Sequence, residues 1–390
     1  MDLLSYEIFL NYEIFIIKMT TSQDKKILEA FNKSLNNYED FQKSIHWKNI
    51  LDDKIKKFNL ENLPNFKNNG LCDDFNNARL MYKKRVIQNF EKFRNKYDFE
   101  NFKKYLFKKD LVGNLKSEYY IDIDGYHIDG YILTLLFLLA NIEKFIFNEK
   151  RINIVCEIGG GDGTLSSMLM KNMNNTKYIH IELPETSFVC SYYLANKFPQ
   201  KKFLFYSDLK KNELSISDIH EYDFIIVPPW VKFNDDLKVD LFINCSSMME
   251  MTSDIIKTYF SLIQNNINLN GLFINSNRYY KDTVNEKIMI SKFPYDMFWK
   301  KIYSNPHDYF PKIHILISER ADEFNNEFVK ELENIYELGK KYMPRDLPLI
   351  FVRLIRFIKN FFGTLKNPTL NTAPRFYFYL RQFIKEKFKI

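Results

Sequence analysis

Three glycines and two carboxylic acids lie within a stretch whose spacing is suited to binding a nucleoside. They are Glu157, Gly159, Gly161, Gly163 and Glu182. Apolar runs at 152–158 and 178–182 are predicted strands, and 165–173 between them is a predicted helix. Glycines let a backbone turn sharply and approach a ligand closely, and an acid after the second strand can accept hydrogen bonds from a ribose diol. The stretch therefore predicts a nucleoside-containing cofactor at the carboxyl end of a parallel sheet.

The residues around the turn also indicate which cofactor it binds. A dinucleotide fingerprint needs a third small residue, but Thr164 or Ser166 stands there, and the phosphate-loop pattern is absent. The carboxylate of Glu157 would repel a pyrophosphate, whereas it suits the positively charged aminocarboxypropyl-sulfonium end of S-adenosylmethionine. The pattern resembles motif I of class I methyltransferases. The alternative is a glycine-rich turn in another α/β domain, and Glu182 at the right distance favours the methyltransferase.

Alternating apolar and amphipathic segments predict an α/β fold from residue 152 to residue 318. The expected order is a doubly wound, Rossmann-like sheet in which ligands bind beyond the carboxyl ends of the strands. Two runs, 203–206 and 223–227, compete for the third strand, and the sequence alone leaves this open. The final strand, 312–318, is expected to be antiparallel, as in a class I methyltransferase sheet.

Three regions are predicted along the chain. Residues 1–110 form an N-terminal helical cap, residues 111–325 the methyltransferase domain, and residues 326–390 a C-terminal helical tail. An apolar helix at 131–147 is expected to be buried against the sheet, after a hairpin at Asp124-Gly125. Residues 1–18 do not resemble a signal peptide; they are either an ordinary helix or the product of an upstream start, with Met19 as the genuine one.

Cysteine usage favours a reducing cytoplasm and no metal site. The four cysteines lack Cys-x-x-Cys spacing and are expected to be free thiols. No clustered His, Asp and Glu spacing calls for a metal, so none is predicted.

Further segments resemble a narrower family. These are Ile181-Glu-Leu-Pro-Glu185, Tyr192-Tyr-Leu194, Asp240-Leu-Phe-Ile-Asn244, Ser247-Met-Met-Glu-Met251 and Asn277-Arg278. Across residues 110–320 the chain is similar to the sugar O-methyltransferase family of bacterial surface-glycan gene clusters. The resemblance implies a methyl acceptor that is a sugar, a nucleotide-sugar or a glycan, in surface polysaccharide biosynthesis. One departure is Glu182, where Asp is commoner, although Glu still reaches a ribose.

Methylation of a sugar hydroxyl needs alignment of the reacting atoms and removal of a weakly acidic proton. His307, in a loop before the last strand on the side where substrates enter, is the favoured general base. Glu250, after the strand 240–245, is the alternative. For either residue a packing or helix-terminal role is the competing interpretation.

The remaining site residues are assigned by position. Glu157 would bind the amino end of the cofactor, Gly159, Gly161 and Gly163 would permit close backbone approach, and Glu182 would hold the ribose. Asp208 is a candidate for the adenine amino group, or else a turn aspartate. Asn244, Asn277 and Arg278 are candidate acceptor-binding residues at strand ends. Trp230 would stack on adenine or a sugar, with ordinary packing as the alternative.

Two other functions stay open at this point. One is a methyltransferase for another small hydroxylated metabolite. The other is a catalytically inactive binding protein that keeps the methyltransferase fold.

The C-terminal tail carries the excess charge of the chain. Between Arg345 and Ile390 ten basic residues face two acids, a net charge of +8 against +7 for the whole protein. These basic residues alternate with aromatics, a composition that attracts anionic membrane surfaces. The simplest alternative is a helical hairpin with a solvated basic face; nucleic acid is not expected as a partner, because no recognition motif accompanies the charge. The predicted location is therefore the cytoplasm, peripheral to the inner membrane if the tail binds lipid.

We predict that the full-length protein co-sediments with anionic vesicles at low salt and dissociates as salt rises. Each basic residue near the surface contributes on the order of 1 kcal/mol, and exposed charges are screened beyond about 10 Å at 0.1 M salt. Sedimentation with anionic and with neutral vesicles measures this. Replacing Lys385, Lys387 and Lys389 by Gln should weaken binding; binding that is absent at low salt would leave the tail as a helical cap.

Overall fold

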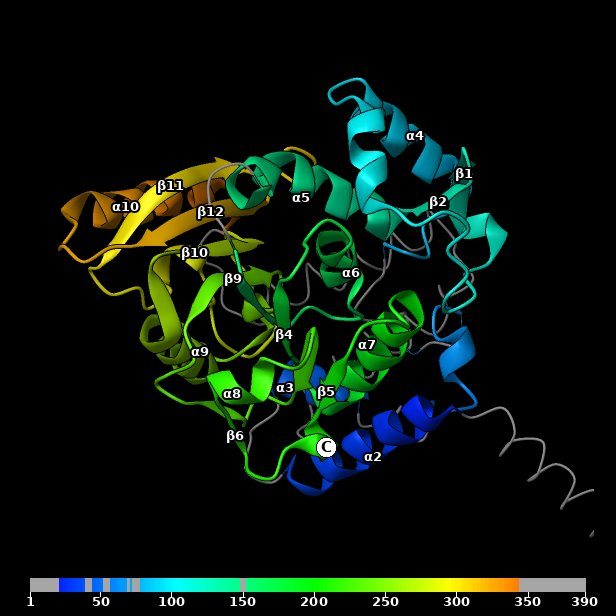
Figure 1. Ribbon diagram of the computed structural model, residues 1–390. Helices are drawn as coiled ribbons and strands as arrows, with labels where there is room; N and C mark the ends of the chain where they lie inside the picture. The colour runs from blue at the N-terminus through cyan, green and yellow to red at the C-terminus, as the bar shows by residue number, and fades with distance from the viewer. Residues whose placement is uncertain are drawn as a thin grey trace, which may run out of the picture. The chain divides into compact units, whose positions relative to one another are not determined.

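A twisted eight-stranded sheet forms the centre of the computed structural model (Figure 1), in the order β11-β12-β10-β9-β3-β4-β7-β5. The structure describes residues 21–38, 44–51, 57–68, 71, 78–147 and 152–343. The strands of this sheet are β3 (Ile154–Ile158), β4 (Lys177–Ile181), β5 (Phe203–Phe205), β7 (Phe224–Val227), β9 (Val239–Cys245), β10 (Ile267–Arg278), β11 (Trp299–Pro306) and β12 (Ile313–Arg320).

The sheet is mostly parallel, as predicted. Strand β3 pairs in parallel with β4 on one side and β9 on the other. Strand β12 is antiparallel to both β10 and β11, which confirms the expected antiparallel final strand. Every residue of β3 and of β7 is buried, because helices cover both faces of such a sheet and both sets of alternating side chains are removed from water.

Both runs that competed for the third strand belong to the sheet. Strand β7 pairs with β4, and β5 forms the edge by pairing with β7. The connection between them holds the short helix α8 (Ile216–Ile219) and β6 (Glu213–Leu214), which pairs with β8 (Lys232–Phe233). Because β7 lies between β4 and β5, the residues that follow β5 lie one strand farther from β3 than they would if β5 paired directly with β4.

Strand β11 was missed because its sequence, Trp-Lys-Lys-Ile-Tyr-Ser-Asn-Pro, carries little apolar alternation. It is the edge strand beyond β12. Lysines at 300 and 301 are typical of an edge that must not pair with another chain.

Helices lie on both sides of the sheet in Figure 1, with α5, α6 and α7 on one face and α8 and α9 on the other. Their bounds are α5 (Gly130–Phe147), α6 (Thr164–Met170), α7 (Pro184–Lys197) and α9 (Ser253–Asn266). Helix α5 is long and apolar enough to cross a membrane by length and composition alone, but 61% of it is buried inside the protein. This agrees with the predicted core helix.

The N-terminal residues form helices that pack on this core. They include α2 (Ser22–Asn36), α3 (Ile45–Leu51), α4 (Lys83–Arg94), the 3-10 helix η4 (Phe99–Tyr105), and the hairpin β1 (Tyr120–Ile123) and β2 (Tyr126–Asp129). Helix α2 begins at a capping box between Thr21 and Asp24. It packs on α7, where the Phe31 and Phe188 rings stack with centroids 4.6 Å apart.

The chain divides into two compact units, residues 1–339 and 340–390. The described part of the predicted cap thus belongs to the same unit as the sheet. So does α10 (Asn326–Gly339), which the sequence analysis assigned to the tail; Lys301 of β11 and Glu331 of α10 form an ion pair of 2.7 Å. The basic, aromatic part of the tail, with residues 1–18, lies outside the described residues.

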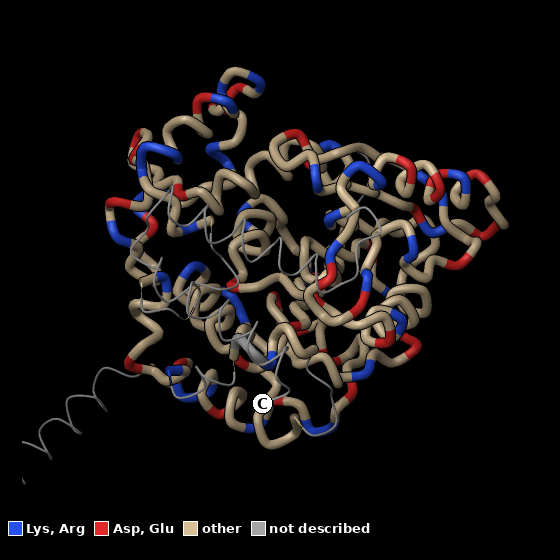
Figure 2. The backbone as a smooth tube through the Cα atoms, turned by 180° about the vertical axis from the view of Figure 1, so that it is seen from behind, with Lys and Arg blue, Asp and Glu red and all other residues tan. Residues whose placement is uncertain are grey.

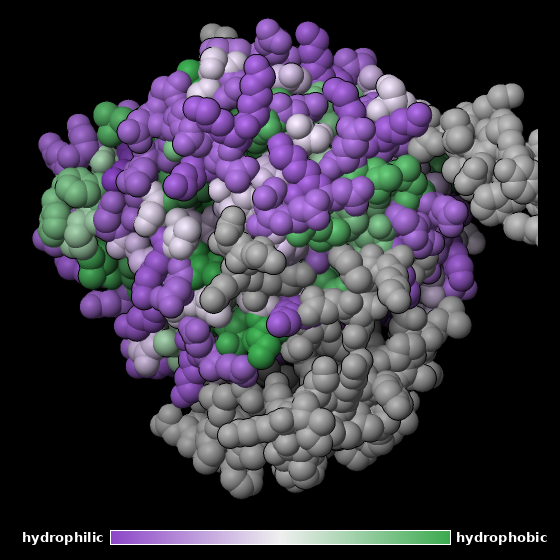
Figure 3. Space-filling view, turned by 90° about the horizontal axis from the view of Figure 1, so that it is seen from below, coloured by the Kyte–Doolittle hydropathy of each residue, from purple (hydrophilic) through white to green (hydrophobic). Residues whose placement is uncertain are grey.

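Charges of both signs are mixed along the described chain (Figure 2). This agrees with a sequence in which the +8 of the tail accounts for the whole net charge. Seen from below, the coloured surface is mainly hydrophilic, with hydrophobic atoms in separate groups (Figure 3).

Candidate functional site

A cavity of about 170 Å³ opens at the carboxyl edge of the sheet. Residues at or just beyond the carboxyl ends of β3, β4, β9 and β10 line it, together with residues at the start of β12 and in the first turns of α5. From the predicted site it contains Glu157, Gly159, Gly161, Glu182, Glu250 and His307. Ligands of doubly wound folds bind at this edge, so the cavity is the candidate site.

The three predicted glycines serve three different purposes. Gly159 has a φ of +69°, and a Cβ there would lie 2.1 Å from Ser247 Oγ, so it admits the segment after β9. Gly161 has a φ of +66° and open space where a Cβ would be, so it is the glycine that leaves room for a ligand. Gly163, the N-cap of α6, faces Cys190 and Leu194 and does not line the cavity. The expected backbone approach therefore concerns Gly161 most directly.

Gly160, which the motif analysis did not use, is needed for packing. A Cβ at this position would lie 2.4 Å from Glu157 Cδ and 2.5 Å from His180 Nε2. The turn thus passes directly over the Glu157 carboxyl group.

Glu182 reaches back to the glycine turn. Its Oε2 accepts a hydrogen bond of 2.9 Å from Gly161 N–H, and its Oε1 accepts one of 2.8 Å from Leu183 N–H. Burial raises the pKa of Glu182 to about 8, and these two backbone donors only partly offset the effect. The carboxyl group still has lone pairs that can accept further hydrogen bonds, and a ribose diol would supply the donors.

Glu157 is buried at the base of the same turn. Its Oε2 accepts a hydrogen bond of 2.8 Å from the Tyr178 hydroxyl, and the His180 Nε2 lies 3.7 Å away. Burial raises the pKa of Glu157 to about 7, and burial holds the pKa of His180 down at about 4, so this histidine is neutral at pH 7. A cation entering the cavity would stabilise the ionised form of Glu157.

Glu250, at the end of a 3-10 turn after β9, is the carboxylate in the cavity with cationic neighbours. Its Oε1 forms a short contact with Lys281 Nζ and lies 3.7 Å from His46 Nε2. Burial opposes its ionisation, but Lys281, His46 and Arg278 outweigh burial and lower its pKa. Glu250 is therefore ionised at neutral pH, whereas burial raises the pKa of Glu157 and of Glu182.

His307 lies in the cavity wall, but its ring is constrained by its own loop. Nδ1 accepts hydrogen bonds from the backbone N–H groups of Tyr309 (3.1 Å) and Phe310 (3.2 Å). Burial holds the pKa of His307 down at about 4. A general base here would need the opposite tautomer, so the geometry does not favour the predicted base role.

Asn244 and Asn277 do not line the cavity, contrary to the predicted contact with an acceptor. The side-chain amide of Asn244 donates to Ile158 O (2.7 Å) and Ser247 Oγ (2.6 Å), and its oxygen accepts from Asn277 (2.7 Å). Both are fully buried. They hold the ends of β3, β9 and β10 together beneath the glycine turn.

Three other predicted residues are also outside the cavity lining. Asp208 follows the edge strand β5, accepts from Phe205 N–H (3.0 Å) and pairs with Lys26 (3.4 Å), so its turn role is the one observed. Trp230 donates to the Tyr206 hydroxyl (3.0 Å) and packs against Tyr38. Arg278 is exposed at the end of β10, where it contributes to the charge around Glu250.

Residues that motif spacing could not identify complete the cavity. Tyr131 and Thr134 of α5, and Ser44 and Trp47 at α3, also line the cavity. They come from segments that are remote in sequence from the glycine turn, with no pattern to connect them to it.

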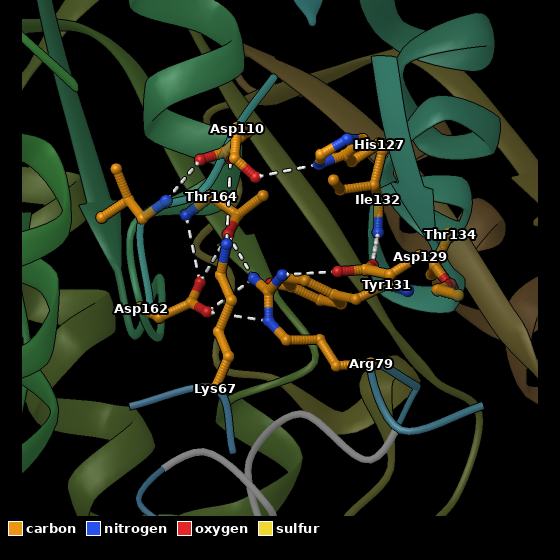
Figure 4. Close-up of polar contacts among 12 residues, drawn as sticks. Lys67, Arg79, Asp110, His127, Asp129, Tyr131, Ile132, Thr134, Asp162 and Thr164 are labelled. Atoms are coloured by element: carbon orange, nitrogen blue, oxygen red, sulfur yellow. Dashed lines mark hydrogen bonds and ion pairs between the residues drawn. The ribbon is translucent and has the colours of Figure 1, made fainter. Parts of the chain in front are cut away.

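Arg79 joins α5 to the glycine turn (Figure 4). Its guanidinium donates to Asp162 Oδ2 from Nε (3.1 Å) and from Nη2 (2.6 Å), and to Asp129 Oδ2 from Nη1 (2.8 Å). Asp162 lies within the glycine turn, while Oδ1 of Asp129 accepts from the first N–H groups of α5. One arginine therefore ties the turn to the helix α5, whose first turns line the cavity.

A second buried ion cluster adjoins the first. Asp110 pairs with Lys197 (2.6 Å) and Lys67 (3.8 Å). Burial lowers the pKa of both lysines, to about 8 for Lys197, although Asp110 opposes this. Across the two clusters, three cations are matched by three carboxylates, as buried charges require. The cations are Lys67, Arg79 and Lys197, and the carboxylates are Asp110, Asp129 and Asp162.

No protein-family model matches the sequence, and no curated protein is similar to it. Among solved structures the chain is similar to the mitomycin 7-O-methyltransferase, with 12% identity over 49% of this chain and 57% of that one, at a TM-score of 0.34. The chain thus spans a little over half the length of that enzyme.

Two further structures show the same level of similarity. SibL, an S-adenosylmethionine-dependent methyltransferase, has 8% identity over 61% of this chain and 74% of that one, at a TM-score of 0.34. Magnesium protoporphyrin IX methyltransferase from Synechocystis PCC 6803, solved with the bound cofactor, has 12% identity over 48% and 78%, at a TM-score of 0.31. The function of this chain is therefore argued from its own residues.

We predict that Arg79→Met lowers the free energy of unfolding by about 3–5 kcal/mol, because it leaves Asp129 and Asp162 as uncompensated buried charges. Urea unfolding followed by circular dichroism measures the change. Arg94→Met is the matched control: Arg94 is exposed and lies 3.5 Å from Glu91, a surface pair expected to contribute about 0–1 kcal/mol. Equal losses in the two variants would contradict the role given to the buried network.

Proposed function

We propose that the protein is an S-adenosylmethionine-dependent O-methyltransferase whose acceptor is a hydroxyl group of a sugar. The observation that carries the proposal is the pair of buried carboxyls, Glu157 and Glu182, on either side of a glycine turn that leaves open space at Gly161. Hydroxyl donors and a positive charge are the ligand groups that suit such a pair.

The residues present fit this cofactor. Glu182 would hold the ribose hydroxyls, and Glu157 would face the amino end of the methionine moiety, directly or through water. A pyrophosphate-bearing cofactor fits poorly, because two carboxyls and no cation stand beside the turn among the cavity residues that the structure describes. When bound, S-adenosylmethionine supplies an activated methyl group on a sulfonium.

The acceptor would occupy the other half of the cavity, beyond β9. Ser246, Ser276 and Glu250 line that half, so it offers hydroxyl groups and an ionised carboxylate. During transfer the acceptor oxygen forms a bond to the methyl carbon as the sulfur–carbon bond breaks, and Glu250 accepts the hydroxyl proton. Lys281 holds the Glu250 carboxylate in place through their contact.

The sugar class of the acceptor is supported by the resemblance of residues 110–320 to the sugar O-methyltransferase family. We propose that the acceptor is a sugar, a nucleotide-sugar or a glycan precursor in the cytoplasm. The C-terminal tail would lie near the membrane if it binds lipid. A panel of methyl glycosides and UDP-sugars, incubated with isotopically labelled S-adenosylmethionine, tests it. Transfer confined to non-sugar alcohols would favour another hydroxylated metabolite, and binding of S-adenosylmethionine with no transfer would favour an inactive binding protein.

We expect Glu182→Ala to weaken binding of S-adenosylmethionine and S-adenosylhomocysteine by about 1–3 kcal/mol, because ribose hydroxyls would lose their acceptors. Calorimetry measures the dissociation constants, with NAD and ATP as ligands expected not to bind. Glu221→Ala, at an exposed position, is the control and should bind normally. Unchanged affinity in Glu182→Ala would remove the ribose assignment.

We expect Glu250→Gln to lower kcat by roughly 10²–10⁴-fold, the usual contribution of a general base, with little change in cofactor affinity. Steady-state kinetics on the best acceptor of the panel measures this, with exposed Glu323→Gln as the control. If turnover survives in Glu250→Gln and is lost in every His307 variant, the base is His307 instead.

A further inference from the structure

The protonation state of His307 is set by its loop. Two backbone N–H groups point at Nδ1, from Tyr309 and Phe310, and a backbone N–H can only donate. Nδ1 must therefore carry a lone pair, which places the proton of the neutral ring on Nε2. Histidine tautomers are inferred from such partners, and here both partners are of unambiguous polarity.

The loop that holds His307 is closely packed. The His307 backbone N–H donates to Ile313 O at 2.8 Å, which closes the loop between β11 and β12. The Tyr309 ring stacks on Phe137 of α5 with centroids 4.7 Å apart. The ring of His307 is thus held in one orientation before any ligand arrives.

The charged neighbour of His307 is engaged elsewhere. Asp308 pairs with Lys96 at 2.6 Å and accepts from the Tyr97 hydroxyl. Although Asp308 favours the charged ring, burial dominates and holds the pKa of His307 down at about 4. At pH 7 His307 is neutral, with an N–H on Nε2.

The position of His307 in the sheet indicates which ligand this donor meets. Glu182 and the glycine turn follow β4 and β3, whereas His307 precedes β12, with β9 and β10 in between. His307 lies in the cavity wall on the side of the proposed acceptor. Among the residues that the structure describes, no side chain or backbone group is hydrogen-bonded to Nε2.

We propose that His307 is a fixed N–H donor that binds an oxygen atom of the acceptor and does not take its proton. This inference rests on the proposed function, since it assigns a role within the acceptor half of the same site. It predicts an acceptor with a second oxygen near the methylated hydroxyl, as vicinal sugar hydroxyls provide. A single-hydroxyl alcohol would leave the Nε2–H unpaired in the cavity and be a poor substrate.

The tautomer is tested without any turnover. In the full-length protein labelled with ¹⁵N-histidine, His307→Gln assigns the ring signals of His307 by their disappearance. We expect an unprotonated Nδ1, a protonated Nε2 and no titration between pH 5.5 and 8.5. A proton on Nδ1, or titration near pH 6.5, would overturn the proposal and would say nothing against methyl transfer. Adding S-adenosylhomocysteine should leave the Nε2 signal nearly unchanged; a large shift would assign the donor to the cofactor.

Two substitutions separate donor from base in catalysis. Glutamine can place an amide N–H near the position of Nε2 but cannot act as a base, and phenylalanine keeps the ring shape without a donor. Both substitutions remove the Nδ1 atom that accepts the N–H groups of Tyr309 and Phe310. A difference between the two variants therefore cannot come from that loss. We expect His307→Gln to keep turnover within about tenfold of wild type on the best panel acceptor, and His307→Phe to raise the KM of that acceptor roughly 10–100-fold.

The opposite result is equally clear. If His307 is the base, both variants lose kcat by roughly 10²–10⁴-fold. The kcat of His307→Gln is then no higher than that of His307→Phe. Calorimetry with S-adenosylhomocysteine shows whether each variant is folded and binds cofactor. If no panel member is methylated by the wild-type protein, the proposed function fails while the ¹⁵N measurement still decides the tautomer.

Discussion

The guanidinium of Arg79 is the contact on which the shape of the site depends. It is 1% exposed and bonds at once to Asp162 in the glycine turn, to Thr164 at the start of α6 and to Asp129 just before α5. An arginine can serve three partners because its donors form a rigid planar fork. One buried side chain therefore fixes the position of α5 relative to the glycine turn, and both of these segments line the cavity.

Charge divides the cavity into two halves with different chemistry. Around the glycine turn, Glu157 and Glu182 are buried with no cation paired to them in the described structure, and burial raises the pKa of both. Beyond β9, Glu250 is ionised because Lys281 and His46 lie beside it. Groups that are costly to ionise are suited to binding donors and cations, and an ionised carboxylate is suited to accepting a proton. In the proposed function, the pair beside the glycine turn binds the cofactor and Glu250 takes the proton.

The doubly wound sheet, its antiparallel final strand, the hairpin at Asp124-Gly125 and the buried helix α5 could all be predicted from periodicity and turn residues. Strand β11 could not, because it is a polar edge strand. Neither could the order of β5 and β7, since two short apolar runs look alike until they pair. That pairing also explains Asp208: the extra strand moves it away from the glycine turn.

The sequence by itself determined the turn and its acids, because Glu157, Gly161 and Glu182 belong to one strand–helix–strand unit whose geometry follows from local spacing. Tertiary structure alone decided the rest. Arg79 and Asp162 are 83 residues apart. Asn244 and Asn277 stand at strand ends in the sequence, but only the fold shows that they bond to each other and not to a ligand. The proton on His307 depends on where two backbone N–H groups point. Such features depend on contacts between distant segments, which residue types and spacing do not specify.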